Sequence, residues 1–129
     1  MRQYFKVSAA GLIAVWALPV LAHHSFASQY DADAPVSLTG TVTRVEWTNP
    51  HARFYIDVAD ENGQVHTWNL ELASPNVLRR NGWLRNSLEE GDHVTVEGSR
   101  ARDGSFMANA RTVTLKDGTQ VFARPAQVD

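Results

Sequence analysis

The sequence has 129 residues, no cysteine and a formal net charge of −2, from 12 basic and 14 acidic side chains. The lack of cysteine excludes disulfides, thiolate catalysis and cysteine-based metal sites. A mildly acidic chain also lacks the basic footprint of a nucleic-acid-binding protein. The length suits one domain with a single hydrophobic core.

Residues 1–22 have the three parts of a secretory signal peptide. Arg2 and Lys6 give a positive start, residues 7–18 are apolar and uncharged, and Ala22 is a small residue at the expected cleavage position. The apolar run is shorter than the roughly 20 residues that a membrane-spanning helix needs. We therefore predict cleavage after Ala22, export to the periplasm and no membrane anchor on the mature protein. Removing 22 of the 129 residues leaves 107, takes away Arg2 and Lys6, and changes the net charge from −2 to −4.

The mature chain is predicted to begin with an extended arm over residues 23–35, which are largely polar and show no periodicity. A strand is expected from residue 36 to Trp47, where apolar and polar residues alternate. The apolar phase of this strand shifts beside Gly40, which is typical of a β-bulge or a strong bend. Asn49 and Pro50 form the turn that ends the strand.

Further strands and one helix follow. Strands are predicted over 52–59, 64–72, 92–98, 107–116 and 119–123. Ser74 and Pro75 have the residue types of an N-cap and a first helical position, and they predict a helix of about two turns. An OB-type Greek-key barrel has three strands, then a short helix and then two strands, which is the order found here. We therefore predict an all-β, OB-like barrel of five to six strands over 36–123. A frayed tail is expected over 124–129. An SH3-like barrel is the main alternative, and the helix favours the OB type.

The five histidines are the main candidates for chemistry, since the sequence has no nucleophile elbow, phosphate loop or suitably spaced pair of carboxylates. After cleavage at Ala22, His23 would have a free α-amino group that can chelate a metal together with the His23 ring. His24 offers a second geometry, in which its ring, the intervening amide and the terminal amine hold Cu(II). All-nitrogen ligand sets favour copper, with zinc as an alternative. The other interpretation is that both histidines simply begin the mature chain.

His51 is the best candidate for a third nitrogen, which would complete a copper site of the histidine-brace type. It follows the turn at Pro50 and is in phase with Arg53 and Tyr55, which the alternation places on the outer face of the strand. A turn histidine can equally bond to backbone carbonyls. Glu71, on the outer face of the next strand, is either an ordinary exposed acid or a cleft carboxylate that accepts a hydrogen bond from a ligating imidazole.

The remaining two histidines are predicted to have no part in a metal site. His66 shares a face with Trp68, Leu70 and Leu72, so it is expected to be a partly buried structural residue. His93 is expected on the surface, at the start of its strand.

Several segments of the sequence together resemble a family of small exported bacterial proteins of unknown function. They are 23–26, 39–42, 46–51, 74–76, 82–83 and 91–92. Members of the family begin with two histidines directly after the signal peptide, so the resemblance supports cleavage after Ala22. It covers nearly the whole mature chain but implies no activity. The characteristic residues of the family correspond here to His23, His24, Asn49, Pro50, His51 and Glu71, without an assigned role.

These residues predict an exported periplasmic binding protein that holds copper or a related metal through His23, with His24 and His51 as further candidate ligands. We expect a monomer that is not an enzyme and does not bind nucleic acid. The alternative is a metal-free OB-type module that binds a peptide, a glycan or a partner protein on the outer barrel face, around Asn49, Arg53, Tyr55 and Glu71. A copper oxidase of the histidine-brace type is a third hypothesis, for which the sequence offers no substrate platform.

Overall fold

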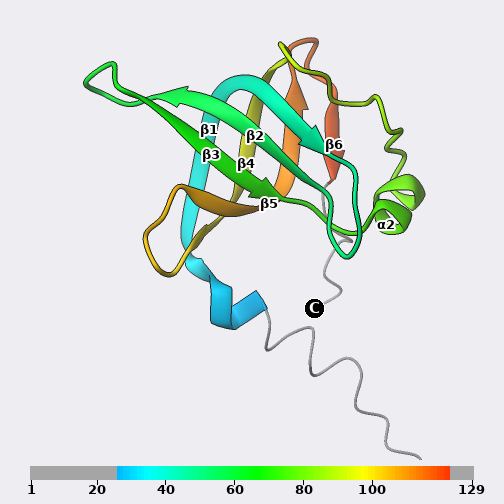
Figure 1. Ribbon diagram of the computed structural model, residues 1–129, viewed down its shortest axis with the longest axis horizontal. Helices are drawn as coiled ribbons and strands as arrows, with labels where there is room; N and C mark the ends of the chain where they lie inside the picture. Colours follow the sequence, from blue (N-terminus) through cyan, green and yellow to red (C-terminus); the bar gives the residue numbers. More distant parts are fainter. Residues whose placement is uncertain (1–25, 123–129) are drawn as a thin grey trace, which may run out of the picture.

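A computed structural model describes residues 26–122, which form a barrel of six strands with a short helix at its side and a helical turn before the first strand (Figure 1). The sheet order is β3-β2-β1-β4-β5-β6, and a parallel pairing of β3 with β5 closes the barrel. The other neighbouring pairs are antiparallel. The elements are β1 (Tyr30–Glu46), β2 (Arg53–Ala59), β3 (Val65–Glu71), α2 (Pro75–Arg80), β4 (His93–Ala101), β5 (Met107–Leu115) and β6 (Gln120–Phe122).

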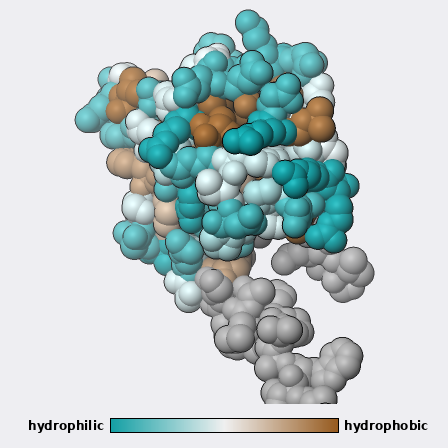
Figure 2. All heavy atoms as spheres, turned by 45° about the vertical axis from the view of Figure 1, so that its right-hand side comes forward, coloured by the Kyte–Doolittle hydropathy of each residue, from teal (hydrophilic) through white to brown (hydrophobic). Residues whose placement is uncertain are grey.

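The alternation of apolar residues determines which face of each strand lies in the core. Phe54 and Ile56 of β2 and Leu70 of β3 are fully buried, and they pack in one cluster with apolar residues of β1, β4 and β5. Helix α2 begins where it was predicted, with the Ser74 side chain accepting a hydrogen bond from the backbone N–H of Val77 at 3.4 Å. Hydrophilic residues predominate on the face drawn in Figure 2, where hydrophobic residues form only small patches.

The start of β1 differs from the prediction. The expected extended arm over 23–35 is wrong for its described part, because residues 26–29 form a helical turn and the following six belong to β1. In this part of β1, Tyr30 pairs with Ala101 and Pro35 with Ser99, both on β4. Backbone hydrogen bonds between paired strands do not require alternating apolar side chains. The periodicity of the sequence therefore could not reveal that the strand begins at Tyr30.

The predicted irregularity of β1 has two parts. At Thr41 the strand passes from its pairing with β4 to its pairing with β2, and the register against β2 shifts between Val42 and Arg44. Gly40, just before this point, lies against the backbone carbonyl of Asp57, and a Cβ atom at residue 40 would collide with that carbonyl. The glycine therefore allows the two backbones to approach where β1 changes partner.

Some predictions concern residues outside the described range of 26–122. They are the signal peptide, the metal ligands His23 and His24, and the tail over 124–129. Within the described range, no helix is long and apolar enough to cross a membrane.

Candidate functional site

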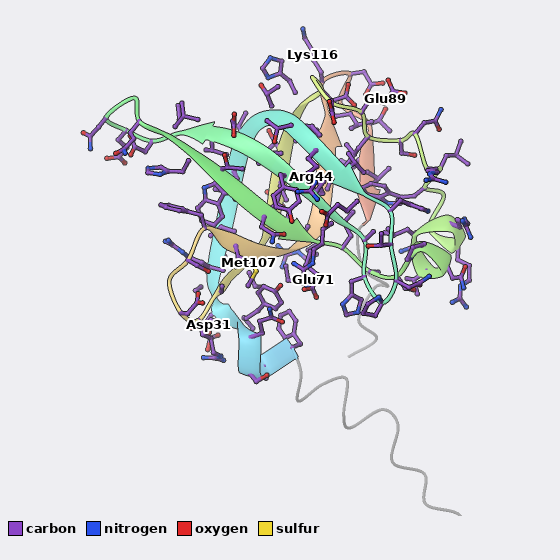
Figure 3. The ribbon with its side chains drawn as sticks, viewed as in Figure 1. Asp31, Arg44, Glu71, Glu89, Met107 and Lys116 are labelled. Carbon is purple, nitrogen blue, oxygen red and sulfur yellow. The ribbon has the colours of Figure 1, made fainter. Side chains whose placement is uncertain are left out.

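A buried carboxylate, Glu71 at the end of β3, is the centre of a polar cluster outside the core (Figure 3). Its Oε2 atom accepts hydrogen bonds from the Tyr30 hydroxyl at 2.7 Å and from Nη2 of Arg53 at 2.6 Å. Its Oε1 atom lies 3.3 Å from Nδ1 of His51. Three side chains, one from the first residue of β1 and two from the start of β2 and the loop before it, thus converge on one carboxylate.

The strand registers explain this convergence. Arg53 is the residue of β2 directly opposite Glu71, so the two side chains share the outer face of the antiparallel pair. His51 lies just before β2, in the loop that contains the cis Asn49–Pro50 peptide bond. Tyr30, the first residue of β1, comes from 41 positions earlier in the sequence than Glu71.

The charge of the carboxylate is compensated within the cluster. Glu71 is only 7% exposed, and a buried carboxylate is tolerated where it has a counter-charge and hydrogen-bond donors. The guanidinium of Arg53 supplies the counter-charge and also donates to Oδ1 of Asn69 at 3.2 Å. Burial, followed by the hydrogen bond to Glu71 and the charge of Glu71, raises the pKa of the Tyr30 phenol well above its ordinary value. The phenol therefore stays protonated and keeps donating to Glu71 at physiological pH.

His51 is the exposed member of the cluster. Its side chain is 49% exposed, and its Nδ1 faces Glu71. An imidazole that faces a carboxylate with one nitrogen is oriented to offer its other nitrogen, here Nε2, to a ligand or metal. Among residues 26–122, no group of three or more His, Asp or Glu side chains is placed to hold a metal ion.

The structure brings together three of the residues that the sequence singled out, namely His51, Arg53 and Glu71. Of the two sequence-based alternatives for Glu71, the buried position excludes an ordinary exposed acid. Tyr55 is outside the cluster and lies under the guanidinium of Arg44, at 5.3 Å from the ring centre. Asn49 is exposed in the loop before His51.

His66 and His93 lie elsewhere. His66 bonds to Asp60 at 2.9 Å and stacks on Phe106 with 4.2 Å between ring centres, in a partly buried setting. This hydrogen bond holds the pKa of the exposed Asp60 carboxyl below its ordinary value. His93 is exposed on β4, with Nδ1 3.3 Å from the hydroxyl of Thr41.

Sequence reasoning missed Tyr30, because it lies in the stretch that was expected to be an extended arm. The one available signal was the presence of two aromatic residues, Phe26 and Tyr30, four positions apart in an otherwise polar segment. Their rings pack together with 5.6 Å between centres. The helical turn that precedes β1 is thereby connected to the Glu71 cluster.

Sequence reasoning also missed Asn109, which pairs with Glu71 across the parallel β3–β5 contact. Asn109 is buried, and its Oδ1 has no hydrogen-bond partner within the described part of the chain. No feature of the sequence marks this asparagine, since its burial depends on a pairing between distant strands.

The strand order and the closure of the barrel define an OB-like fold. The chain belongs to a family of unknown function, DUF6152, whose family model matches residues 10–110. The predicted membership in such a family is thus confirmed. No curated protein sequence matches the chain.

Solved structures similar to this chain include two crystal forms of the mitochondrial single-stranded-DNA-binding protein of S. cerevisiae. Both have a TM-score of 0.51, with 15% and 16% identity, and the matches cover 64% of this chain and 93% and 92% of theirs. The N-terminal domain of the PriB protein from Thermoanaerobacter tencongensis matches with a TM-score of 0.44 and 19% identity, over 64% of this chain and 96% of its own. The likeness to the two yeast structures confirms the predicted OB-like fold, and at such low identity it concerns the fold alone.

Proposed function

We propose that this protein is an exported periplasmic metal-binding module, in which the mature N-terminus at His23 and the side chain of His51 together hold a copper ion. The observation that carries the proposal is the position of His51, whose Nδ1 lies 3.3 Å from the buried carboxylate of Glu71. A carboxylate that orients one imidazole nitrogen is a recurring feature behind metal-ligating histidines. The half-exposed ring leaves Nε2 accessible to a metal.

The described start of the chain supports a contribution from the N-terminus. Phe26 packs on Tyr30, and the Tyr30 hydroxyl bonds to the same carboxylate that His51 faces. His23 precedes Phe26 by three residues, so extended chain of at most about 10 Å separates their Cα atoms. An N-terminus created by cleavage after Ala22 would thus be three residues from Phe26, which contacts the cluster through Tyr30.

The ligand types favour copper. Cleavage after Ala22 gives His23 an α-amine and a ring nitrogen, and Nε2 of His51 is the third nitrogen. Copper(II) binds such nitrogen sets more tightly than the other divalent first-row metals, with zinc as the main competitor. His24 allows a competing chelate made only by the N-terminus, from its ring, the intervening amide and the terminal amine.

The metal-free alternative on the outer barrel face has less support, because its residues are already engaged with one another. Arg53 is bonded to Asn69 and Glu71, and Tyr55 is covered on one side by Arg44. The yeast structures are those of a single-stranded-DNA-binding protein, but the mature chain proposed here has a net charge of −4 and no basic excess for such a partner. We therefore favour a metal bound through His51 over a macromolecule bound on the outer barrel face.

The decisive experiment compares the mature protein, which starts at His23, with the same protein acetylated at the α-amine of His23. Cu(II) binding is measured by calorimetry and by electron paramagnetic resonance. We expect one tight site in the mature protein and a loss of at least about 100-fold in affinity on acetylation, because an acetylated nitrogen no longer chelates copper together with the His23 ring. Equal binding by both proteins, or no binding by either, would overturn the proposal.

The role of His51 is tested with His51→Ala and with His93→Ala as the matched control, since His93 is an exposed histidine outside the cluster. We expect His51→Ala to weaken copper binding and to change the resonance spectrum, whereas His93→Ala leaves both as in the unsubstituted protein. If His51→Ala binds copper as the unsubstituted protein does, the site is a chelate of the N-terminus alone and the proposal is wrong.

A further inference from the structure

The outer edge of β3 is only partly covered by β5. Asn69, Leu70 and Glu71 pair with β5, whereas the earlier residues of β3 pair only with β2 within the described part of the chain. β5 begins at Met107, opposite Asn69, and the residues before it belong to the loop from β4. Figure 1 shows that the β2–β3 hairpin, which contains the uncovered part of the edge, projects beyond the other strands.

Two residues of this edge, Val65 and Thr67, present their backbone groups to solvent. The N–H of Asn69 donates to the carbonyl of Phe106 at 3.0 Å, so the backbone of Asn69 faces away from β2. Because the backbone groups of a strand alternate in direction, those of Thr67 and Val65 face the same way. No strand within residues 26–122 pairs with them there. The edge therefore has two N–H groups and two carbonyls in the arrangement that an added strand binds.

Exposed apolar side chains lie along the same edge. Val65 is 58% and Phe106 is 44% exposed, and Leu84 is the one other large apolar residue in the described part of the chain that is as exposed. The Phe106 ring stacks on His66 with 4.2 Å between ring centres, so it is fixed against β3. Strand edges that face water are usually protected by lysine, proline or a bulge. The uncovered part of β3 has none of these, which is typical of a surface that receives a strand.

The two faces of this edge differ in charge. On one face, the guanidinium of Arg100 lies 5.2 Å from the centre of the Trp68 ring, and it makes no ion pair within the described residues. On the other face, the carboxylate of Asp57 accepts a hydrogen bond from the Thr67 hydroxyl at 2.7 Å. An added strand would place successive side chains on opposite faces. Charge complementarity therefore favours an acidic side chain beside Arg100 and an apolar one beside Val65.

We propose that the edge of β3 at Val65 and Thr67 binds an extended peptide segment of a partner protein, in which apolar and acidic residues alternate. The segment continues the line of β5 along β3, and its backbone bonds to the free groups of Val65 and Thr67. Its apolar side chains pack beside Val65, and its acidic side chains reach Arg100. The site is formed by residues outside the Glu71 cluster, so it is a second binding function that does not depend on the proposed copper site.

The probe is the peptide Val-Asp-Val-Asp-Val, blocked at both ends and added to the copper-free, isotope-labelled mature protein. Binding is followed by nuclear magnetic resonance. We expect a dissociation constant below about 1 mM, with larger shifts of the amide signals of Val65 and Thr67 than of those of β6. Val-Lys-Val-Lys-Val is the control, and it should bind at least about 5-fold more weakly because it places cations beside Arg100. No binding of the acidic peptide at about 1 mM would overturn the proposal.

Methylation of the peptide backbone tests strand addition directly. Only every second amide of an added strand faces its neighbour. We therefore expect methylation of one alternating set of N–H groups to abolish binding and methylation of the other set to preserve it. Binding that survives both methylations would show contacts through side chains alone and would contradict strand addition.

Two substitutions in the protein test the side-chain contacts. Arg100→Gln has Arg111→Gln as its matched control, since Arg111 is an exposed arginine on β5. Phe106→Ser has Leu84→Ser as its control, since Leu84 is an exposed apolar residue of the connection after α2. We expect Arg100→Gln and Phe106→Ser each to weaken binding of the acidic peptide by about 3- to 10-fold, and the controls to leave it unchanged. Unchanged binding in both Arg100→Gln and Phe106→Ser would show that the assigned contacts are wrong.

A second copy of the chain is the other occupant that this edge could pair with. Sedimentation without peptide, at the concentrations of the titration, separates the two cases, and we expect a monomer. A dimer that Val65→Lys converts to a monomer would show that a second copy covers the edge, and it would overturn the proposal. None of these measurements uses copper, so their outcome and that of the copper titrations are independent.

Discussion

At the scale of single residues, Glu71 combines burial with a negative charge. Its two short hydrogen bonds come from a neutral phenol and a cationic guanidinium, so the charge of the carboxylate is compensated within the protein. If Glu71 lost its negative charge, the partly buried guanidinium of Arg53 would be left without a counter-charge, which would destabilise the fold.

We predict that Glu71→Gln lowers the free energy of unfolding by about 2 kcal/mol, because it weakens two charge-assisted hydrogen bonds and leaves Arg53 without its counter-charge. Urea denaturation of the variant and the unsubstituted protein measures this change. Glu46→Gln is the matched control, since Glu46 pairs with the well-exposed Arg44, and such surface pairs contribute about 0–1 kcal/mol. Equal losses in the two variants would contradict the role assigned to Glu71.

The raised pKa of Tyr30 predicts a specific loss of stability in alkaline solution. A phenol whose pKa is higher in the folded than in the unfolded protein stabilises the fold below the unfolded pKa of about 10, and this contribution falls as the pH rises further. We expect the stability difference between the unsubstituted protein and Tyr30→Phe to be constant from about pH 7 to 9. Above about pH 10 it should narrow by up to about 1.4 kcal/mol per pH unit. A constant difference in urea denaturation up to about pH 11 would contradict this prediction.

At the scale of elements, the sequence predicted those features that depend on neighbouring residues. Alternation located β2 and β3 to within a residue at each end, and Ser74 with Pro75 marked the start of α2. The phase of β2 and the turn before it also singled out His51 and Arg53. The start of β1 could not be predicted in this way, because it is defined by pairing with β4, about 70 residues further along the chain.

The candidate site also combines features that neighbouring residues predict with features that depend on contacts between distant strands. Glu71 could be placed on the outer face of β3 from its phase, but its burial depends on Tyr30 and on the neighbouring strand β5, which alternation does not report. An outer-face position was therefore compatible with both an exposed acid and a cleft carboxylate. Only the non-local contacts decide between them.

We predict that Gly40→Ala destabilises the barrel by about 1–3 kcal/mol, because the new Cβ would collide with the carbonyl of Asp57 where β1 changes partner. Ser37→Ala is the control on the same strand, at an exposed position where a change of about 0.5 kcal/mol or less is expected. Chemical denaturation of both variants tests this. Similar stability of the two would show that the strands can separate enough to admit a methyl group.

At the scale of the whole molecule, the closed barrel and the Glu71 cluster have separate roles. The apolar core holds the strands in register, and that register places Arg53, Glu71 and Asn109 side by side on three successive strands. The cluster in turn connects the barrel to the first described turn of the chain through Tyr30. This turn, over residues 26–29, is therefore connected to the same carboxylate that His51 faces.

The charge of the whole molecule leads to a prediction about its partners. Binding of single-stranded DNA needs a basic groove and exposed aromatic rings, whereas the proposed mature chain has a net charge of −4 and its outer β2–β3 face includes the acids Asp57 and Glu71. We expect no change in the fluorescence anisotropy of a labelled oligothymidylate on adding the mature protein at about 150 mM salt, and at most weak binding at about 50 mM. The yeast mitochondrial single-stranded-DNA-binding protein, which has the same fold, is the positive control. Tight binding by the mature protein that weakens steeply with salt would contradict the prediction, because it would show that this barrel neutralises phosphates despite its net charge.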